Sequence, residues 1–399
     1  MIRRATDLPE GGGSVVQGGN EEQDEDAGKI RPAVSATPPA GATCEIPLFA
    51  RFPLLARRVP HLSLHEGPTP VDRLAGLSAA LGRDDVWIKN DGLFGTIYGG
   101  NKPRKLQFIL ADALRRGCRR VLTTGTIGTN HGLATALYAR EFGLETSILM
   151  AYESPSAETV TTLLHTADAG ARIHYTRSYP LTAVLAPWYI FRCRRQDGRL
   201  PYLLGPGGSS PLAALGYADA AFELAEQVRC GELPAPATII VPLGTGGTVA
   251  GLLAGLRLAG LDTNIVAVCA TRAPTTWRPA VLRLARAVCR RIARDGGVTE
   301  AASMRLEGLR IERGWLGPGF GRTSEAGAAA GAMLEDEEGL RLDPVYTAKS
   351  MAALIDLSRA GELPGPVLFW HTYNVIPLVE PSADAASRLP SSLRRVCGL

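Results

Sequence analysis

The chain has 399 residues, of which 45% are hydrophobic and 21% charged, a composition typical of a globular protein with two or three domains. Its net charge of +4 is small against 43 basic and 39 acidic residues, so it indicates neither a nucleic-acid partner nor an anionic membrane surface. Seven scattered cysteines without a CxxC pair argue against a disulfide framework and a cysteine zinc site, and they favour the reducing cytoplasm.

The first 43 residues are rich in glycine, proline and acidic residues, including the run EEQDED, and they have no apolar period. Such a composition buries too little apolar surface to fold, so we predict a disordered N-terminal tail. The tail lacks the apolar stretch of a signal peptide, and no later run approaches the ~20 residues of a membrane span. We therefore expect a cytoplasmic protein without a membrane partner.

A histidine pair follows, His61 and His65 in HLSLH. Two imidazoles can begin a zinc site, but such a site needs further ligands and no third candidate lies at useful spacing. We interpret the pair as alternation in a short extended segment, and we predict no metal.

From residue 46 onward, β-branched runs alternate with helical apolar periods. This alternation predicts an α/β fold with parallel sheets flanked by helices, whose ligands bind beyond the carboxyl ends of the strands. The helix 275–294 is rich in arginine, which we interpret as a solvated face rather than a nucleic-acid or partner face. The predicted strands are 86–89, 120–124, 146–150, 238–243, 264–270 and 366–372, and the other predicted helices are 103–116, 131–142, 157–168, 211–230, 248–259, 323–334 and 347–360.

The stretch GGNKPRK, residues 99–105, places a lysine at the start of a helix. Asn101 is a reasonable cap, Pro103 suits the first turn, and Gly117 ends the helix. The helix dipole disfavours a protonated amine at this end, which lowers the pKa of Lys102 and makes it a better nucleophile toward a carbonyl. Arginine cannot replace it because arginine keeps its proton. A lysine that only extends to solvent is the alternative.

Lysine is rare in this chain, because 38 of the 43 basic residues are arginine. Arginine therefore supplies the routine surface charge, and a lysine is more often required as a lysine. The five lysines are Lys29, Lys89, Lys102, Lys105 and Lys349.

A second loop lies in VPLGTGGTVAGLLAGL, where a predicted strand leads through a glycine-rich turn into a helix. Backbone N–H groups of such a turn can hold a phosphate at the helix N-terminus. The pattern is neither GxGxxG nor GxxxxGK[ST], so a nicotinamide-dependent dehydrogenase and a P-loop enzyme are disfavoured. A turn without a ligand is the alternative. The turn residues are Gly244, Thr245, Gly246, Gly247 and Thr248.

A third loop lies in TTGTIGTNHGLATALYARE, where a strand ends and a helix begins near His131. Thr129 and Asn130 place a hydroxyl and an amide at this helix start. A helix cap and nothing more is the alternative reading for these two residues.

In their order, these segments resemble the motifs of the D-cysteine desulfhydrase and 1-aminocyclopropane-1-carboxylate deaminase family. That family belongs to the tryptophan-synthase-β-like, fold type II pyridoxal-phosphate enzymes. The resemblance spans roughly Glu66 to His371, and its specific motifs are GGNK-x-RKL and DPVY-x-x-KSM. The segments are GGNKPRKLQFILADALRRG, TNHGLATALYAREFGL, GPGGSSPLAALGYADAAFEL, VPLGTGGTVAGLLAGL and LDPVYTAKSMAALIDL.

The resemblance implies that Lys102 holds pyridoxal 5′-phosphate covalently and that Asn130 lies beside the ring, near its 3′-oxygen. It also implies that Thr129 and Tyr346 face the substrate and that Thr347 is the partner of the pyridine nitrogen. The implied phosphate site comprises Gly244, Thr245, Gly246, Gly247 and Thr248, with charge from Lys105.

Thr347 separates two branches of this family. In the deaminase branch the position resembles a glutamate, which keeps the ring nitrogen protonated and the electron sink strong. Threonine is neutral and leaves a weaker sink, which suffices when an α-proton and a good leaving group such as sulfide depart. We therefore predict a pyridoxal-phosphate-dependent carbon–sulfur lyase that converts a small amino acid to an α-keto acid and ammonia. The amine of Lys102, or Tyr346 on the other face, is expected to take the α-proton.

Other departures indicate a subgroup with its own substrate. The HTGG segment of the family reads HTYN here, so Tyr373 and Asn374 replace two glycines, and Thr129 replaces a serine. Gly128 stands where the family has a larger polar residue. Deamination of 1-aminocyclopropane-1-carboxylate, racemisation and β-replacement are alternative reactions. A catalytically idle relative that binds a ligand is a further alternative, which the intact Lys102 argues against.

We expect two α/β domains with the cofactor between them. The larger domain is predicted to combine 44–104 with 206–399, and the smaller to span 105–205. The resemblance also implies a homodimer.

Overall fold

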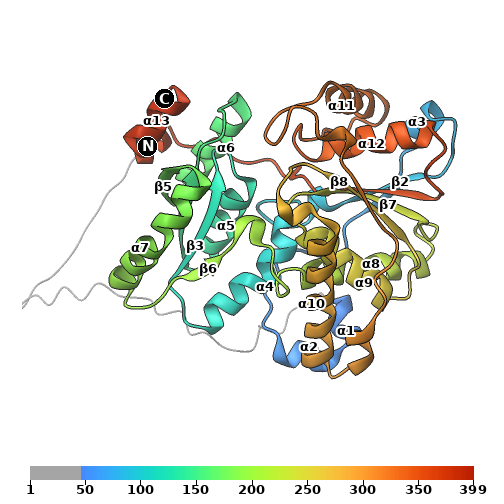
Figure 1. Ribbon diagram of the computed structural model, residues 1–399, viewed down its shortest axis with the longest axis horizontal. Helices are drawn as coiled ribbons and strands as arrows, with labels where there is room; N and C mark the ends of the chain where they lie inside the picture. Colours follow the sequence, from blue (N-terminus) through green and yellow to red (C-terminus); the bar gives the residue numbers. More distant parts are fainter. Residues whose placement is uncertain (1–45) are drawn as a thin grey trace, which may run out of the picture. The chain divides into compact units, whose positions relative to one another are not determined.

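The computed structural model describes residues 46–399, which belong to one compact unit (Figure 1). The predicted tail 1–43 lies outside these residues. Within the described part of the chain, none of the helices has both the length and the apolar character that crossing a membrane requires.

The larger sheet has six strands in the order β1-β2-β10-β7-β8-β9, and all neighbours run parallel except β1 and β2. Ile239 and Val241 of β7 pack into one apolar cluster and Ile240 into another, so both faces of the sheet are covered. This is why its strands read as continuous apolar runs. The strands are β1 (Val71–Arg73), β2 (Val86–Asn90), β7 (Thr238–Leu243), β8 (Asn264–Cys269), β9 (Leu309–Glu312) and β10 (Val367–His371).

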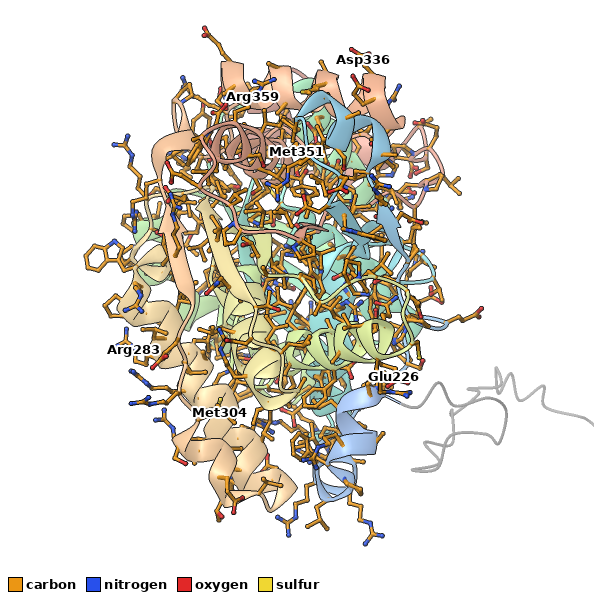
Figure 2. All side chains as sticks on the ribbon, turned by 90° about the vertical axis from the view of Figure 1, so that its right-hand side faces the viewer. Glu226, Arg283, Met304, Asp336, Met351 and Arg359 are labelled. Atoms are coloured by element: carbon orange, nitrogen blue, oxygen red, sulfur yellow. The ribbon has the colours of Figure 1, made fainter. Side chains whose placement is uncertain are left out.

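Helices cover both faces of this sheet. The cluster on one face includes α1, α2, α8, α9 and α10, and the cluster on the other includes α3, α11 and α12. Met351 of α12 is buried in the second cluster, whereas Asp336 and Arg359 lie at the surface (Figure 2). The helices are α1 (Pro47–Arg51), α2 (Pro53–Arg58), α3 (Ala75–Ala80), α8 (Leu215–Arg229), α9 (Gly247–Leu258), α10 (Arg278–Gly296), α11 (Glu325–Glu338) and α12 (Thr347–Arg359).

The smaller sheet has four parallel strands in the order β5-β4-β3-β6. Leu133 of α5 and Ile109 of α4 pack with Val121 of β3, while Leu163 of α6 packs with Ile148 of β4. The strands and helices are β3 (Arg120–Thr126), β4 (Glu145–Ala151), β5 (Arg172–Arg177), β6 (Tyr202–Leu204), α4 (Asn101–Arg115), α5 (Asn130–Glu141), α6 (Ala157–Asp168) and α7 (Tyr179–Asp197).

The predicted α/β fold is confirmed, and each predicted strand and helix is present with ends shifted by a few residues. Gly117 follows α4 with a φ of 65°, as expected for the residue that ends a helix. Exposed Arg283, Arg286 and Arg290 on α10 agree with the solvated arginine face (Figure 2).

The sequence did not predict α7, because this helix buries few of its side chains. Thr182 and Cys193 are its buried residues, so it has little of the apolar period that marks a helix. Pro187 inside the helix also argues against one from sequence alone. Its outer face instead exposes large side chains such as Trp188 and Phe191.

The smaller sheet is built from the segment 105–205 and the larger sheet from the rest of the described chain. The helix α13 (Ser391–Cys397) departs from this pattern, since Leu393 packs in the cluster of Ile148 and Leu163. The division into two domains stays a prediction.

Candidate active site

The helix α4 begins where the GGNK segment meets the end of β10. Gly100 occupies the N-cap position with a φ of 87°, and an added Cβ would lie 2.6 Å from the carbonyl oxygen of Thr372. The N–H of Asn101 donates to that carbonyl at 3.0 Å. The expectation that Asn101 caps the helix is therefore wrong, because a glycine is needed for so close an approach.

Lys102 lies in the first turn of α4 and is half-buried. Its Nζ donates to Oδ1 of Asn101 at 2.7 Å. Burial lowers the pKa of Lys102 to about 8, although the negative charge of Asp343 acts in the opposite direction. The direction agrees with the sequence prediction, and burial rather than the helix dipole is its main cause. A substantial fraction of neutral amine is thus present near neutral pH.

The glycine-rich turn joins β7 to α9 and meets two further polar groups. Gly246 is the N-cap of α9 with a φ of 85°. The N–H of Gly247 donates to Oγ of Ser209 at 3.2 Å, and that hydroxyl lies 2.6 Å from Oγ1 of Thr245. An added Cβ on Gly247 would lie 2.6 Å from Ser209 Oγ and 3.3 Å from Lys105 Nζ. A hydroxyl pair and an amine therefore converge on one helix N-terminus.

The cations near this turn are buried without a counter-charge. Burial and the neighbouring charge of Lys102 hold the pKa of Lys105 well below its usual value, and no carboxylate of residues 46–399 forms an ion pair with it. Burial, Lys102 and Lys105 together lower the pKa of His131 to about 3. Its Nδ1 is buried without a hydrogen-bond partner among the described residues. This arrangement favours an anionic ligand.

Thr129 caps α5, since its Oγ1 accepts from the N–H of Gly132 at 3.2 Å. Asn130 is the first helical residue, and both side chains are half-buried. The predicted helix cap is therefore confirmed for Thr129. Neither side chain hydrogen-bonds to Lys102 or to the glycine-rich turn within residues 46–399, although His131 beside them senses the charge of Lys102. A role for them toward cofactor or substrate stays a prediction.

Asp343 organises the start of α12. Its buried carboxylate accepts from the N–H groups of Tyr346 at 2.8 Å and Thr347 at 2.9 Å. Oγ1 of Thr347 donates to Oδ1 of Asp343 at 2.6 Å and accepts from the N–H of Asp343 at 2.9 Å, so its proton is engaged and one acceptor position of the oxygen is left. Burial and the charge of Asp343 raise the pKa of Tyr346, whose ring lies against Gly244.

Three residues near the site were missed from the sequence. Ser209 lies in GPGGSS, His131 in TNHG and Asp343 in LDPVY, so each stands within one of the motifs described above. An aspartate directly before a proline at a helix start was the available signal for Asp343.

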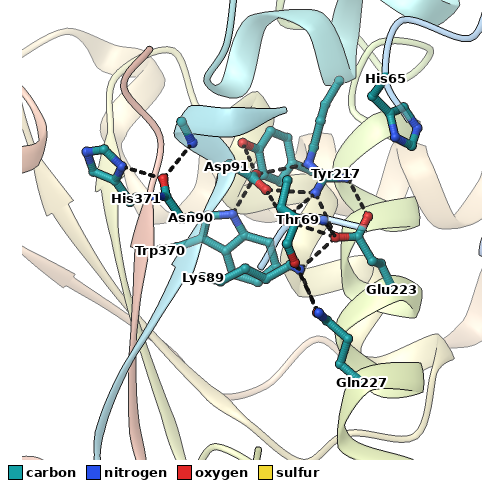
Figure 3. A network of polar contacts seen from close by, with 12 residues as sticks. His65, Thr69, Lys89, Asn90, Asp91, Tyr217, Glu223, Gln227, Trp370 and His371 are labelled. Carbon is teal, nitrogen blue, oxygen red and sulfur yellow. Dashed lines mark hydrogen bonds and ion pairs between the residues drawn. The ribbon is translucent and has the colours of Figure 1, made fainter. Parts of the chain in front are cut away.

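A fully paired network lies on the other side of α4 (Figure 3). Arg104 forms ion pairs with Asp91 at 2.7 Å and Glu223 at 3.0 Å, and Glu223 also pairs with Lys89 at 2.6 Å. Nε1 of Trp370 donates to Asp91 at 2.7 Å. Burial alone would raise the pKa of Glu223, but Arg104 and Lys89 hold it well below its usual range. The network fixes the helix that carries Lys102 to β2, β10 and α8.

Comparison with known proteins decides the family. Residues 62–372 match the family described as pyridoxal-phosphate dependent enzyme. The chain belongs to the pyridoxal-phosphate dependent enzymes. This range contains Lys102, the glycine-rich turn and Asp343, so the site just described lies within the family's region.

Individual relatives are similar over most of this pyridoxal-phosphate dependent enzyme. The D-cysteine desulfhydrases of Salmonella schwarzengrund (strain CVM19633) and Salmonella choleraesuis (strain SC-B67) are each 35% identical over 322 residues, which cover 79% of this chain and 94% of theirs. A solved structure described as an ACC deaminase homologue has a TM-score of 0.70 and 29% identity, covering 86% of this chain and 99% of that one. A solved T.th. threonine deaminase, at 19% identity with a TM-score of 0.54, covers 84% of this chain and 98% of its own and shares the fold type II architecture.

The residues present fit the family's cofactor. Lys102 supplies an amine of lowered pKa for a covalent bond to an aldehyde. The buried amine of Lys105, which a bound phosphate would help to protonate, the Ser209 hydroxyl and the N–H groups at the start of α9 provide the donor set that a phosphate requires. Any side chain at position 247 would crowd the Ser209 hydroxyl, so a glycine lets these donors lie close together. A cavity of about 300 Å³ borders Ser209, Thr245 and Gly246, but the rest of its lining includes α10 residues such as Arg283, and neither Lys102 nor Lys105 lines it.

Proposed function

We propose that this enzyme is a lyase of the D-cysteine desulfhydrase type. It would remove the α-proton and the β-substituent of a small amino acid, giving an α-keto acid, ammonia and, from cysteine, sulfide. The observation that carries the proposal is the half-buried amine of Lys102, with a pKa of about 8, in a chain 35% identical to D-cysteine desulfhydrases over nearly their whole length.

Each site residue has a proposed role. Lys102 would hold pyridoxal 5′-phosphate, which when bound supplies an electron sink for the bonds at Cα. Asn130 would lie beside the ring near its 3′-oxygen, and the acceptor oxygen of Thr347 would face the ring nitrogen. The phosphate would be held by Lys105, Ser209, Gly244, Thr245, Gly246, Gly247 and Thr248.

Two groups can move the α-proton. The amine of Lys102 is a suitable base because its pKa of about 8 leaves it partly neutral at physiological pH. Tyr346 has a raised pKa, so its phenol keeps its proton and is better suited to donate than to accept. We therefore propose Lys102 as the base, Tyr346 as a proton donor and Thr129 as a contact of the substrate.

The test is incubation of the purified enzyme with D-cysteine and assay of sulfide and pyruvate. Sulfide release, lost after borohydride reduction of the bound cofactor, is the expected result. Absence of sulfide in enzyme that carries cofactor would overturn the substrate assignment and leave the cofactor assignment intact.

A second candidate reaction is deamination of 1-aminocyclopropane-1-carboxylate, which the similarity to the ACC deaminase homologue favours. A screen of D- and L-amino acids that includes this compound and follows α-keto acid release separates the two. We also propose a cytoplasmic homodimer of two-domain subunits with the cofactor between domains, on the family resemblance. Light scattering of the purified protein tests the oligomeric state.

A further inference from the structure

The loop after β10 carries Tyr373 and Asn374, where the resemblance described above implies two glycines, and hydrogen bonds hold it in place. Oδ1 of Asn374 accepts from the N–H of Gly99, and also from the N–H of Ile376 at 3.1 Å. The carbonyl of Thr372 accepts from Asn101 at 3.0 Å. Tyr373 stands between these two attachments. Its backbone is therefore held directly against the segment that carries the nucleophilic lysine.

The side chain of Tyr373 reaches toward the smaller sheet. Its hydroxyl donates to Oε1 of Glu158 at 3.2 Å, and Glu158 lies in the first turn of α6. The next residue, Thr159, packs against Gly128: a Cβ added to Gly128 would lie 2.4 Å from the Cβ of Thr159. Gly128 directly precedes Thr129. The contact between Tyr373 and Glu158 thus joins the loop near Lys102 to the loop that carries Thr129.

The charge of Asp343 links the pair of Tyr373 and Glu158 to Lys102. The charge of Asp343 raises the pKa of Lys102, and it also raises the pKa of Tyr373 and of Glu158. One buried carboxylate therefore acts on all three groups. Burial is the main cause of both raised pKa values and the charge of Asp343 adds to it, although Glu158 is an exposed residue of α6. Tyr373 remains a neutral donor, and Glu158 is the carboxylate it holds.

We propose that Tyr373 and Glu158 form the element that selects the substrate's side chain. The phenol ring occupies space that two glycines would leave open, so bulky β-substituents are excluded. The carboxylate of Glu158, reinforced by Asp343, repels an acidic β-substituent and accepts a neutral or cationic one. This inference rests on the proposed function for the kind of ligand, a small amino acid.

The test measures binding rather than turnover. Amino acids that bind the holoenzyme change the absorbance of its cofactor, so alanine, aspartate and leucine can be titrated as both enantiomers. Glu158→Gln keeps a hydrogen-bond acceptor and removes the charge. We expect it to tighten aspartate binding by about tenfold relative to alanine, because a like-charge contact is lost. Glu325→Gln, which alters a first-turn glutamate of α11, is the matched control and should leave the ratio unchanged.

Size selection is tested at the other partner. Tyr373→Gly should tighten leucine binding relative to alanine by about tenfold, whereas Tyr373→Phe, which keeps the ring, should not. Unchanged ratios in Tyr373→Gly and Glu158→Gln would overturn the proposal. Because Tyr373→Gly can loosen the loop, thermal unfolding and cofactor content are measured beside it, and Glu158→Gln decides the charge effect independently. Failure to release sulfide would overturn the proposed function without affecting these binding ratios.

Discussion

Two groups of buried cations flank the start of α4, and their surroundings differ. On one side Arg104 and Lys89 are paired with Asp91 and Glu223 in contacts of 2.6–3.0 Å. On the other side Lys105 has no carboxylate partner among residues 46–399, and its pKa is well below the usual value. One short motif contributes to both groups, since Lys102, Arg104 and Lys105 are neighbours in sequence.

The difference distinguishes charged residues that stabilise the fold from amines that can bind a ligand. A buried ion pair resists the loss of either partner, because the remaining charge is left without compensation. A buried amine without a partner favours its neutral form and binds an arriving anion or carbonyl. Arg104 thus holds the helix in position, while Lys102 and Lys105 are the residues that we propose bind the ligand. Each of the following substitutions tests one side of this contrast.

The largest effect is expected for Lys102→Ala. It removes the nucleophile and the proposed base together, so activity should fall by at least ~10³-fold and borohydride should no longer fix the cofactor to the protein. Mass spectrometry of the reduced protein measures the covalent bond. A fixed cofactor in this variant would show that another lysine carries it.

Arg104→Met tests the paired side. It leaves Asp91 and Glu223 buried without their shared cation, so the free energy of unfolding should fall by about 3–5 kcal/mol. Urea denaturation of the cofactor-free protein measures it. Arg286→Met, at an exposed position of α10, is the control and should change stability by no more than about 0.5 kcal/mol.

Lys105→Met tests the unpaired side and should behave in the opposite way. The cofactor-free protein should be as stable as the parent or more so, because a buried amine without a partner is removed. Affinity for pyridoxal 5′-phosphate should fall by about tenfold to a hundredfold, as expected for a lost charged hydrogen bond. Titration of the cofactor-free protein measures the affinity. A large loss of stability would mean that Lys105 is structural, like Arg104.

Asp343→Asn is expected to have the smallest effect, a shift in pH dependence. The amine of Lys102 reacts when neutral, so capture of pyridoxal 5′-phosphate should rise with pH and level off above a midpoint of about 8. Asp343 raises this pKa, and removing its charge should therefore move the midpoint to lower pH. Asparagine keeps an acceptor for the N–H of Tyr346 but places an NH2 group opposite Thr347, so thermal unfolding is measured beside the pH series. The capture rate at a series of pH values measures the shift, and Glu325→Gln should show none.

The parts of the site that depend on neighbouring residues in the sequence could be predicted. Lys102 and the turn from Gly244 to Thr248 could be predicted because each depends on a strand or helix end within a few residues. The pairing of Tyr373 with Glu158 could not, since 215 positions separate them and only the fold brings them together. The same holds for Arg104 and Glu223, whose charges look like ordinary surface residues in sequence.

The central strands and most helices of the fold could be predicted from the sequence, whereas the strands at the sheet edges could not. A strand that is buried on both faces is a continuous apolar run in the sequence. The six strands predicted from such runs are all present. The helix α7 and the short strands β1, β5, β6 and β9 were not, because they bury fewer side chains or lie at sheet edges. The hydrophobic periodicity of a sequence reflects which side chains are buried, so an element that buries few side chains shows little periodicity.

The burial of the lysines has a practical consequence for labelling. Among residues 46–399, Lys89, Lys105 and Lys349 are buried and Lys102 is half-buried, and Lys89 and Lys349 are also held by hydrogen bonds. Within residues 46–399, reagents that acylate neutral amines therefore find few competing targets in the cofactor-free protein. Of these four lysines, a fluorescent acylating reagent at mild pH should mark Lys102 in preference to the other three, and the label on the peptide that contains Lys102 then counts the competent sites in a preparation.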